Sequence, residues 1–348
     1  MSANKSVLSR TISTPAILLV LLLAIALIAK IAGSGPFERT VTELFIRVVL
    51  VVGLYIFIGN SGVMSFGHVG FMCLGAYGTA WLTIPPAMKK FTLTGLPDFV
   101  LMHQAPLVVS LALAPLLAAA FALIVGRVLM RLAGIAASIA TFAMLAVINV
   151  VYSNWETVTG ATSSVVGIPM YTGVWLSFAG AVFAVFVAYA YGISRFGLAL
   201  RAARDEAIAA RASGVDIERQ RLIAFVISAF VIGVAGVLYA HFLGVINPDA
   251  FYLGLTFISL SMLVVGGMGS LSGAVVGVVA ISAMIESLRA LEKGVSFGEA
   301  SISIPNGVQE IAIGVAMIVI LIFRPSGLMR NRELRWRKWP FERASWKV

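Results

Sequence analysis

The chain has 348 residues, of which 60% are hydrophobic and only 11% are charged. Soluble domains carry about 25% charged residues, so this composition excludes a soluble enzyme, a secreted disulfide scaffold and a disordered chain. Several charge-free runs reach the ~20 residues that cross a bilayer as a helix, which also disfavours a membrane β-barrel with its short alternating segments. We therefore predict an all-α polytopic membrane protein.

The excess of positive charge is clustered rather than spread over the chain. The formal net charge is +10, and of the 25 lysines and arginines six lie in 195–221 and eight in 324–348. Because basic clusters beside membrane spans mark cytoplasmic segments, we interpret both as topology signals and expect no nucleic-acid partner. The tail, with Trp336, Trp339 and Trp346, is expected to lie against anionic lipid headgroups. A polybasic regulatory site is the alternative interpretation.

Ten apolar segments in chain order are candidate membrane spans, and we predict about ten crossings, with eight as the lower bound. The segments are 15–32, 43–58, 69–84, 105–125, 132–151, 174–192, 221–243, 254–266, 271–286 and 307–323. Three of them are weak, because 43–58 and 254–266 are short and 271–286 is rich in glycine and serine. These three are candidates for re-entrant or broken helices.

An even number of crossings places both termini on the same side, as the basic N-terminus and the basic tail require. Counting from a cytoplasmic N-terminus, segments 85–104 and 152–173 lie outside the cell, whereas 126–131 and 193–220 lie inside. The arginine-rich loop therefore falls on the side that its charge predicts.

A short glycine pattern occurs twice. Gly59, Gly62, Ser65 and Gly70 have the same spacing as Gly266, Gly269, Ser272 and Gly277, which follow 207 residues later. Both copies interrupt an apolar run, and irregular backbone at membrane depth is tolerated only where protein or a water-filled cavity satisfies it. Paired interrupted segments point to a transport pathway. Close helix approach through small residues is the equally weighted alternative.

Motifs for catalysis or for an internal energy source are missing. The chain has no Gly-Lys pair and hence no P-loop for ATP phosphates, and its single cysteine, Cys73, leaves no Cys/His zinc spacing. We expect no cofactor and no metal. Ionisable residues well inside the spans are nearly absent, since Arg47 and Glu310 stand close to predicted span ends. Ion-coupled carriers depend on such residues, so we expect the energy source in a partner.

The loop 195–221 contains a candidate short helix. Asp205 is the predicted N-cap, Glu206 and Arg211 suit its first and last turns, and Gly214 is the predicted stop. Its small alanine side chains would let it enter a shallow groove on a partner. The alternative is an ordinary amphipathic surface helix.

At this loop the sequence resembles known permeases. Glu206-Ala207 and Ala209 to Gly214 resemble the EAA-type coupling loop of bacterial ABC importers, and Phe196 to Ser228 resembles the branched-chain amino acid (LIV-type) permease family. Three further stretches agree with that family: 64–77, 159–169 and 265–277. The resemblance covers roughly 45–325, and the Ser65-Phe-Gly-His68 form is similar to the M-type rather than the H-type subunit.

The resemblance implies a type II-like importer and assigns the partners. They are a second, H-type permease, two cytoplasmic ABC ATPases and a periplasmic substrate-binding protein, at the bacterial inner membrane. Residues 1–323 would form one permease domain and 324–348 a basic cytoplasmic tail. The implied ATPase-coupling residues are Arg201, Arg204, Asp205, Glu206, Ala209, Ala210 and Gly214. The candidate pathway or gate residues are Gly62, Ser65, His68, Gly269 and Ser272.

The substrate is left open by one departure from the family pattern. The family often has Gly-Ser-Asp-Gly after Thr159-Gly160, whereas residues 161–165 here read Ala-Thr-Ser-Ser-Val. Branched-chain amino acids, urea, short amides and aromatic carboxylates all remain candidates. A self-sufficient ion-coupled carrier or channel is the rival function, and an intramembrane enzyme is a distant third.

Overall fold

The computed structural model describes residues 13–292, 295–297, 300–302, 308–324, 326–330 and 332–334. Within these residues, one helix corresponds to each of the ten predicted spans. They are α2 (Ser13–Ala32), α3 (Gly35–Ser61), α4 (Val69–Thr83), α7 (Leu107–Leu129), α8 (Ile135–Asn154), α10 (Val174–Ile193), α13 (Ile217–Leu243), α14 (Leu253–Gly266), α15 (Leu271–Glu292) and α16 (Val308–Phe323). Eight spans are long and apolar enough to cross a membrane, while α4 and α16 have 15 and 16 residues. The prediction of a polytopic all-α protein is confirmed.

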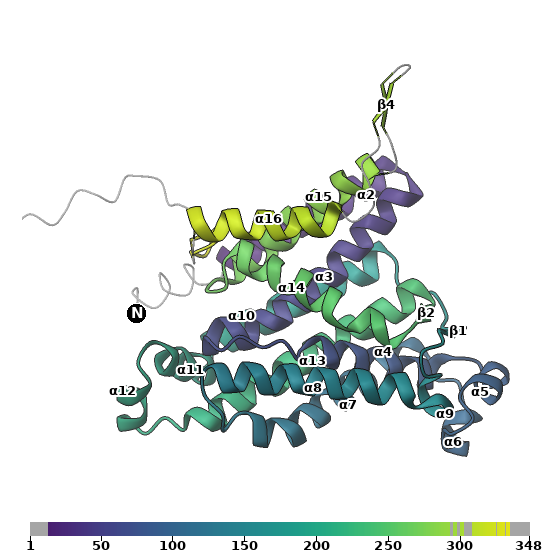
Figure 1. Cartoon of the computed structure of the whole chain (residues 1–348), viewed down its shortest axis with the longest axis horizontal. Coiled ribbons are helices and arrows are strands. Elements are labelled where there is room, and N and C mark those ends of the chain that lie inside the picture. The colour runs from purple at the N-terminus through teal and green to yellow at the C-terminus, as the bar shows by residue number, and fades with distance from the viewer. Residues whose placement is uncertain are drawn as a thin grey trace, which may run out of the picture.

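Short elements gather at the two ends of the helices. One end has α5 (Pro86–Thr92), α6 (Asp98–Leu101), α9 (Glu156–Thr159), the 3₁₀ helix η1 (Pro248–Phe251) and the antiparallel pair β1 (Val165–Val166) and β2 (Val245–Ile246). The opposite end has α11 (Arg195–Asp205) and α12 (Ala207–Ala212), as Figure 1 shows. A separate hairpin pairs β3 (Val295–Phe297) with β4 (Ala300–Ile302).

This arrangement groups the loops as the predicted topology requires. The Gly95 amide donates to the Thr157 carbonyl at 2.9 Å, which joins the two loops predicted outside the cell. At the other end, Arg221 donates to the Leu132 carbonyl at 3.2 Å, beside the loops predicted inside. The direction of the chain through the membrane stays a prediction.

The central helices are α3 and α13, around which α4, α7 and α10 pack. Small residues allow this packing: a Cβ added to Gly75 of α4 would lie 2.4 Å from the carbonyl oxygen of Gly233 in α13. The prediction of a short span at 43–58 is wrong, because α3 has 27 residues and is the most buried span, with 89% of its apolar window inside the protein. It begins earlier since Pro36 suits the first helical turn.

A buried lysine ties the loops together at the end that carries α5 and α6. Lys89 is fully buried, and its ammonium donates to the carbonyls of Leu82, Val100 and His103 at 3.4, 3.0 and 2.8 Å. Burial lowers the pKa of this amine to about 8, so it is still charged at neutral pH. The three carbonyls belong to the end of α4, to α6 and to the segment before α7, and the lysine therefore fixes all three.

We expect Lys89→Ala to lower the thermal unfolding midpoint of the protein purified in detergent. The substitution leaves three carbonyls without their charged donor, at a cost of about 2 kcal/mol. The matched control is Lys90→Ala, since Lys90 is the exposed neighbour on the same helix. Equal midpoints for the two variants would show that the buried amine does not hold the loops.

Candidate functional site

Two spans are broken at the two copies of the glycine pattern. The helix α3 ends at Gly62, which has a φ of +71° and donates to the Ile58 carbonyl at 2.9 Å, and residues 62–68 then connect to α4. Similarly, α14 ends at Gly267, with a φ of +117°, and residues 267–270 lead to α15. The structure thus has a helix, a break and a helix at each copy.

An inner cavity of about 210 Å³ lies between the two breaks. It is lined by Ile58, Gly59, Gly62, Met64, Arg204, Val264, Met268, Gly269 and Ser326. Two predicted pathway residues, Gly62 and Gly269, therefore face one space, and Arg204 of the predicted coupling loop lies beside them. The loop and the breaks are one structural site.

Arg204 connects the loop directly to the end of α3. Its guanidinium donates to the Gly59 carbonyl at 2.6 Å and to the Asp205 carboxylate at 3.0 and 3.1 Å. A Cβ added to Gly62 would lie 2.7 Å from Cγ of Arg204, so this contact needs a glycine. The last carbonyls of a helix have no partner within the helix and carry partial negative charge. A cation is thus well suited to this position.

Arg201, one turn earlier on α11, binds the ends of two helices. It donates to the Gly192 carbonyl in the last turn of α10 at 2.6 Å and to Oδ1 of Asn60 in the last turn of α3 at 3.3 Å. Arg201 and Arg204 therefore both bind the C-terminal ends of helices. These bonds connect α11 directly to the end of α3.

Ser65 and His68 lie in the first break but do not line the inner cavity. Both are buried, and Nδ1 of His68 is 2.6 Å from the Ser65 hydroxyl. The imidazole ring packs among Phe57, Phe71 and Phe225 at centroid distances of 5.1, 5.6 and 5.2 Å. This pair stabilises the connection between α3 and α4, and its role in a pathway stays a prediction.

The C-terminal strap, which we define as residues 326–330 and 332–334, binds the second break. The Leu328 and Met329 amides donate to the carbonyls of Val265 and Gly266 at 2.8 and 3.1 Å. These are the orphan carbonyls at the end of α14. The basic tail is predicted to begin at residue 324, but the chain continues to pack against α14 beyond that residue.

Glu333 of the strap caps the start of α15. Its carboxylate accepts hydrogen bonds from the amides of Leu271 and Ser272 at 2.7 and 3.0 Å and from the Ser272 hydroxyl at 2.7 Å. The same hydroxyl accepts from the Leu334 amide at 2.9 Å. An anion at a helix N-terminus is electrostatically favoured. Ser272 is thus fully buried in the strap contact and is not brought to the inner cavity.

We expect Glu333→Ala to speed amide hydrogen exchange about tenfold in peptides that cover 267–275. Removal of the carboxylate leaves two amides unpaired, at roughly 1–3 kcal/mol, and 1.4 kcal/mol is a factor of ten. Glu286→Ala on α15 is the control, because Glu286 pairs with Arg289 at the surface of the protein. Unchanged exchange in Glu333→Ala would refute the capping role.

The loop contains two helices rather than one. The helix α11 extends to Asp205, so the prediction of Asp205 as N-cap is wrong by one position. The N-cap of α12 is Glu206, whose carboxylate accepts a hydrogen bond from the Ile208 amide at 3.4 Å. The predicted stop is present, because Gly214 has a φ of +82°. An L-residue in this conformation is strained by roughly 1–2 kcal/mol.

The exposed side of α12 also differs from the expectation. Ala210 is only 6% exposed and packs against Ala203 and Ile217 of its own chain, so it cannot meet a partner. All other residues of α12 are exposed, and Ile208 is the large aliphatic one among them, at 80% exposure. An aliphatic side chain this exposed at the tip of a polar loop makes α12 a candidate docking point.

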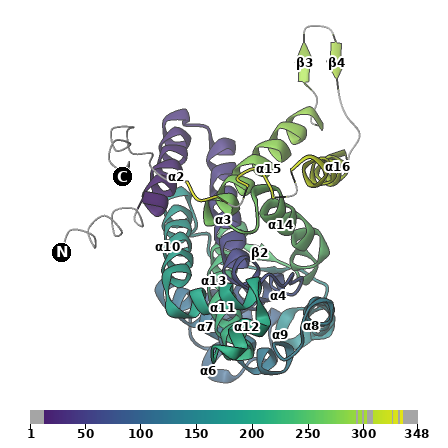
Figure 2. The same ribbon diagram turned by 90° about the vertical axis from the view of Figure 1, so that its left-hand side faces the viewer.

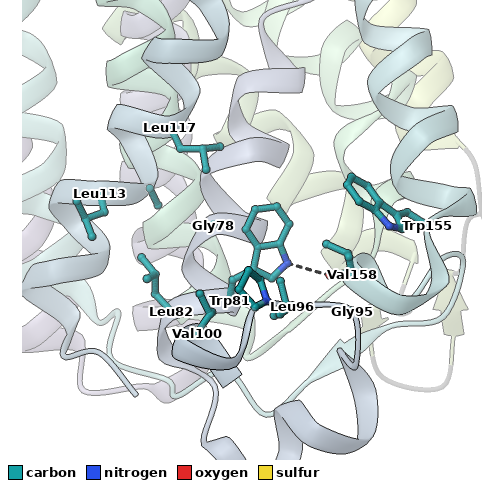
Figure 3. A pocket seen from close by; sticks show the side chains of 12 residues that line it. Gly78, Trp81, Leu82, Gly95, Leu96, Val100, Leu113, Leu117, Trp155 and Val158 are labelled. Carbon is teal, nitrogen blue, oxygen red and sulfur yellow. Dashed lines mark hydrogen bonds between the residues drawn. The ribbon is translucent and has the colours of Figure 1, made fainter. Parts of the chain in front are cut away.

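A second, apolar cavity of about 380 Å³ lies at the opposite end, between α4, α7, α9 and the loop around α6. Figure 3 shows Trp81 at its centre, with the indole nitrogen donating to the Val158 carbonyl at 2.9 Å. None of the residues that line this cavity is charged, and none belongs to the predicted site.

A multi-pass membrane protein with two broken spans around a cavity has the features of a solute permease. Comparison with known proteins specifies the family. The family model described as "Branched-chain amino acid transport system / permease component" matches residues 37–321, and the chain belongs to this family.

The relatives agree with this assignment. The high-affinity branched-chain amino acid transport system permease protein LivM of Escherichia coli (strain K12) is 26% identical, over 89% of this chain and 74% of that protein. LivM of Salmonella typhimurium is 27% identical over the same shares. LivH of Salmonella typhimurium is 30% identical over 43% of each chain. The resemblance to the M-type subunit is therefore confirmed.

Among solved structures, a chain of an ABC transporter in an inward-facing conformation aligns with 89% of this chain and 98% of its own length. The identity is 17% and the TM-score is 0.40, a similarity too low to support the assignment.

Proposed function

We propose that this chain is the M-type permease subunit of an ABC importer for branched-chain amino acids or a related small polar metabolite. It would work with an H-type permease, two cytoplasmic ATPases and a periplasmic binding protein, and the ATPases would hydrolyse the ATP. Family membership and the LivM relatives support this function. The single observation that carries the mechanism is the bond from Arg204 to Gly59, which joins the coupling loop to the inner cavity.

The coupling mechanism follows the contacts of α11 and α12. An ATPase subunit would receive the exposed Ile208, and its movement would displace α12 together with α11. Because Arg201 and Arg204 of α11 bind the end of α3, that displacement would pull on the break at Gly62. The inner cavity would then open or close with the nucleotide state of the partner.

The proposed orientation puts α11, α12 and the basic tail in the cytoplasm, with the chain in the bacterial inner membrane. Six basic residues in 195–221 and eight in 324–348 support it, since cytoplasmic loops carry an excess of Lys and Arg. The helices α11 and α12 lie together at one end of the long helices (Figure 1), which agrees with a single side of the membrane for the whole loop 195–221.

We expect Ile208→Asp to abolish co-purification of the ATPase subunits and ATP-driven uptake, with normal membrane levels of the permease. The buried face of α12 is untouched by the change, whereas a charge would be introduced at the centre of the docking point. Ile208→Leu is the matched control and should retain at least half of the uptake. The measurement is radiolabelled leucine uptake in cells with quantified permease, together with the subunits recovered from mild detergent. Retained ATPase and uptake in Ile208→Asp would exclude α12 as the docking helix.

A further inference from the structure

A pair of opposite charges lies in the middle of the most buried span. The expectation that Arg47 stands near a span end is wrong, because 12 residues of α3 precede it and 14 follow it. Glu43 is one turn away, about 6 Å along the helix, and its carboxylate accepts from Arg47. The 27 residues of α3 extend over about 40 Å, and a hydrocarbon core about 30 Å thick and centred on this helix would include both charges. Their side chains are 15% exposed for Arg47 and 27% for Glu43.

These two charges line an outer cavity of about 300 Å³. The outer cavity lies beside the N-terminal half of α3, whereas the inner cavity lies beside the C-terminal end of this helix. Asp249 of η1 and Tyr239 of α13 complete its polar part. The remaining lining is mainly apolar and comes from α3, α4 and α14: Ile46, Leu50, Met72, Ala250, Gly254, Leu255 and Ile258. The outer cavity thus combines one cation, two carboxylates and one phenol with an aliphatic wall.

An internal ion pair alone explains this arrangement poorly. A buried pair gives little net stability, because the cost of desolvating both ions offsets their attraction. Within the described residues Arg47 makes one hydrogen bond, to Glu43, although a guanidinium has five N–H donors. Ionisable groups at membrane depth that face a cavity mark solute pathways.

We propose that the outer cavity binds a zwitterionic α-amino acid with an aliphatic side chain. The solute carboxylate accepts hydrogen bonds from Arg47, and its ammonium group donates to Asp249 or Glu43. The side chain packs on the wall formed by α3 and α14. The volume is at the lower limit for small-molecule pockets. This assignment rests on the proposed importer function and narrows its substrates, because urea and amides lack the two charges and a simple carboxylate would be repelled by Asp249.

The outer and inner cavities lie along one helix pair. The outer cavity touches α3 and α14 at Leu50 and Ile258, and the inner cavity touches the same helices at Ile58 and Val264. Contacts between α3 and α14, which are adjacent in Figure 2, join the two levels. Leu54 and Met262 lie between these positions in sequence and are buried at 1% and 0% exposure. The two cavities are thus separated by about 12 Å of packed helix.

The test uses the complete transporter in proteoliposomes, with leucine-loaded binding protein, and measures leucine uptake and ATPase activity in parallel. Arg47→Gln is expected to reduce uptake at least tenfold, while stimulated ATPase stays within about twofold of the wild type. Arg39→Gln, an exposed position on the same helix, is the control and should leave uptake within about twofold.

The double variant Glu43→Gln/Arg47→Gln separates binding from a structural role. Removing one partner of a buried ion pair leaves the other charge buried and uncompensated, which destabilises the protein. Removing both partners avoids this destabilisation. Restored uptake in the double variant would therefore overturn the proposal, and continued loss with assembled, ATP-hydrolysing complexes supports it. If Arg47→Gln alone fails to assemble, the double variant decides the question. If the wild-type complex takes up no leucine, it is the proposed function that fails.

Discussion

Broken helices in a membrane must find partners for their terminal backbone groups inside the protein, because the hydrocarbon offers none. In this permease those partners come from segments far away in sequence. The carbonyl of Gly59 in the last turn of α3 is bound by Arg204. The first amides of α15 are bound by Glu333. Each break is therefore held by a segment that is distant in sequence, and these contacts link the helix breaks to the position of that segment.

The helix α3 makes this link mechanically useful. Its end is held by Arg201 and Arg204, its middle contains the Glu43–Arg47 pair, and both cavities touch it. In the proposed mechanism, a displacement of α11 would therefore act on the helix that lines both cavities. The helix α3 also packs closely on α13, where the Gly53 carbonyl accepts a hydrogen bond from the Ser228 hydroxyl at 2.7 Å.

The spans could be predicted from the sequence because continuous hydrophobicity needs no tertiary information. The start of α3 was missed since Glu38 and Arg39 interrupt the apolar run, and this error displaced Arg47 to a span end. The side of α12 that faces the chain could not be predicted, because a helix of alanines has no apolar stripe. Glu333 was invisible as a cap, since it lies 61 residues from Ser272. Gly62, Gly269 and Arg204 were each predicted, and only the structure places them around one cavity.

The central claim is that Arg204 transmits the movement of the coupling loop to the inner cavity. The most direct measurement is the number of leucine molecules taken up per ATP hydrolysed by reconstituted transporter that contains Arg204→Gln. The account predicts ATPase activity within about twofold of the wild type and uptake reduced at least tenfold, equivalent to 1.4 kcal/mol or more. Arg219→Gln, an exposed arginine at the start of α13, should keep the wild-type ratio. An unchanged ratio for Arg204→Gln would contradict the account.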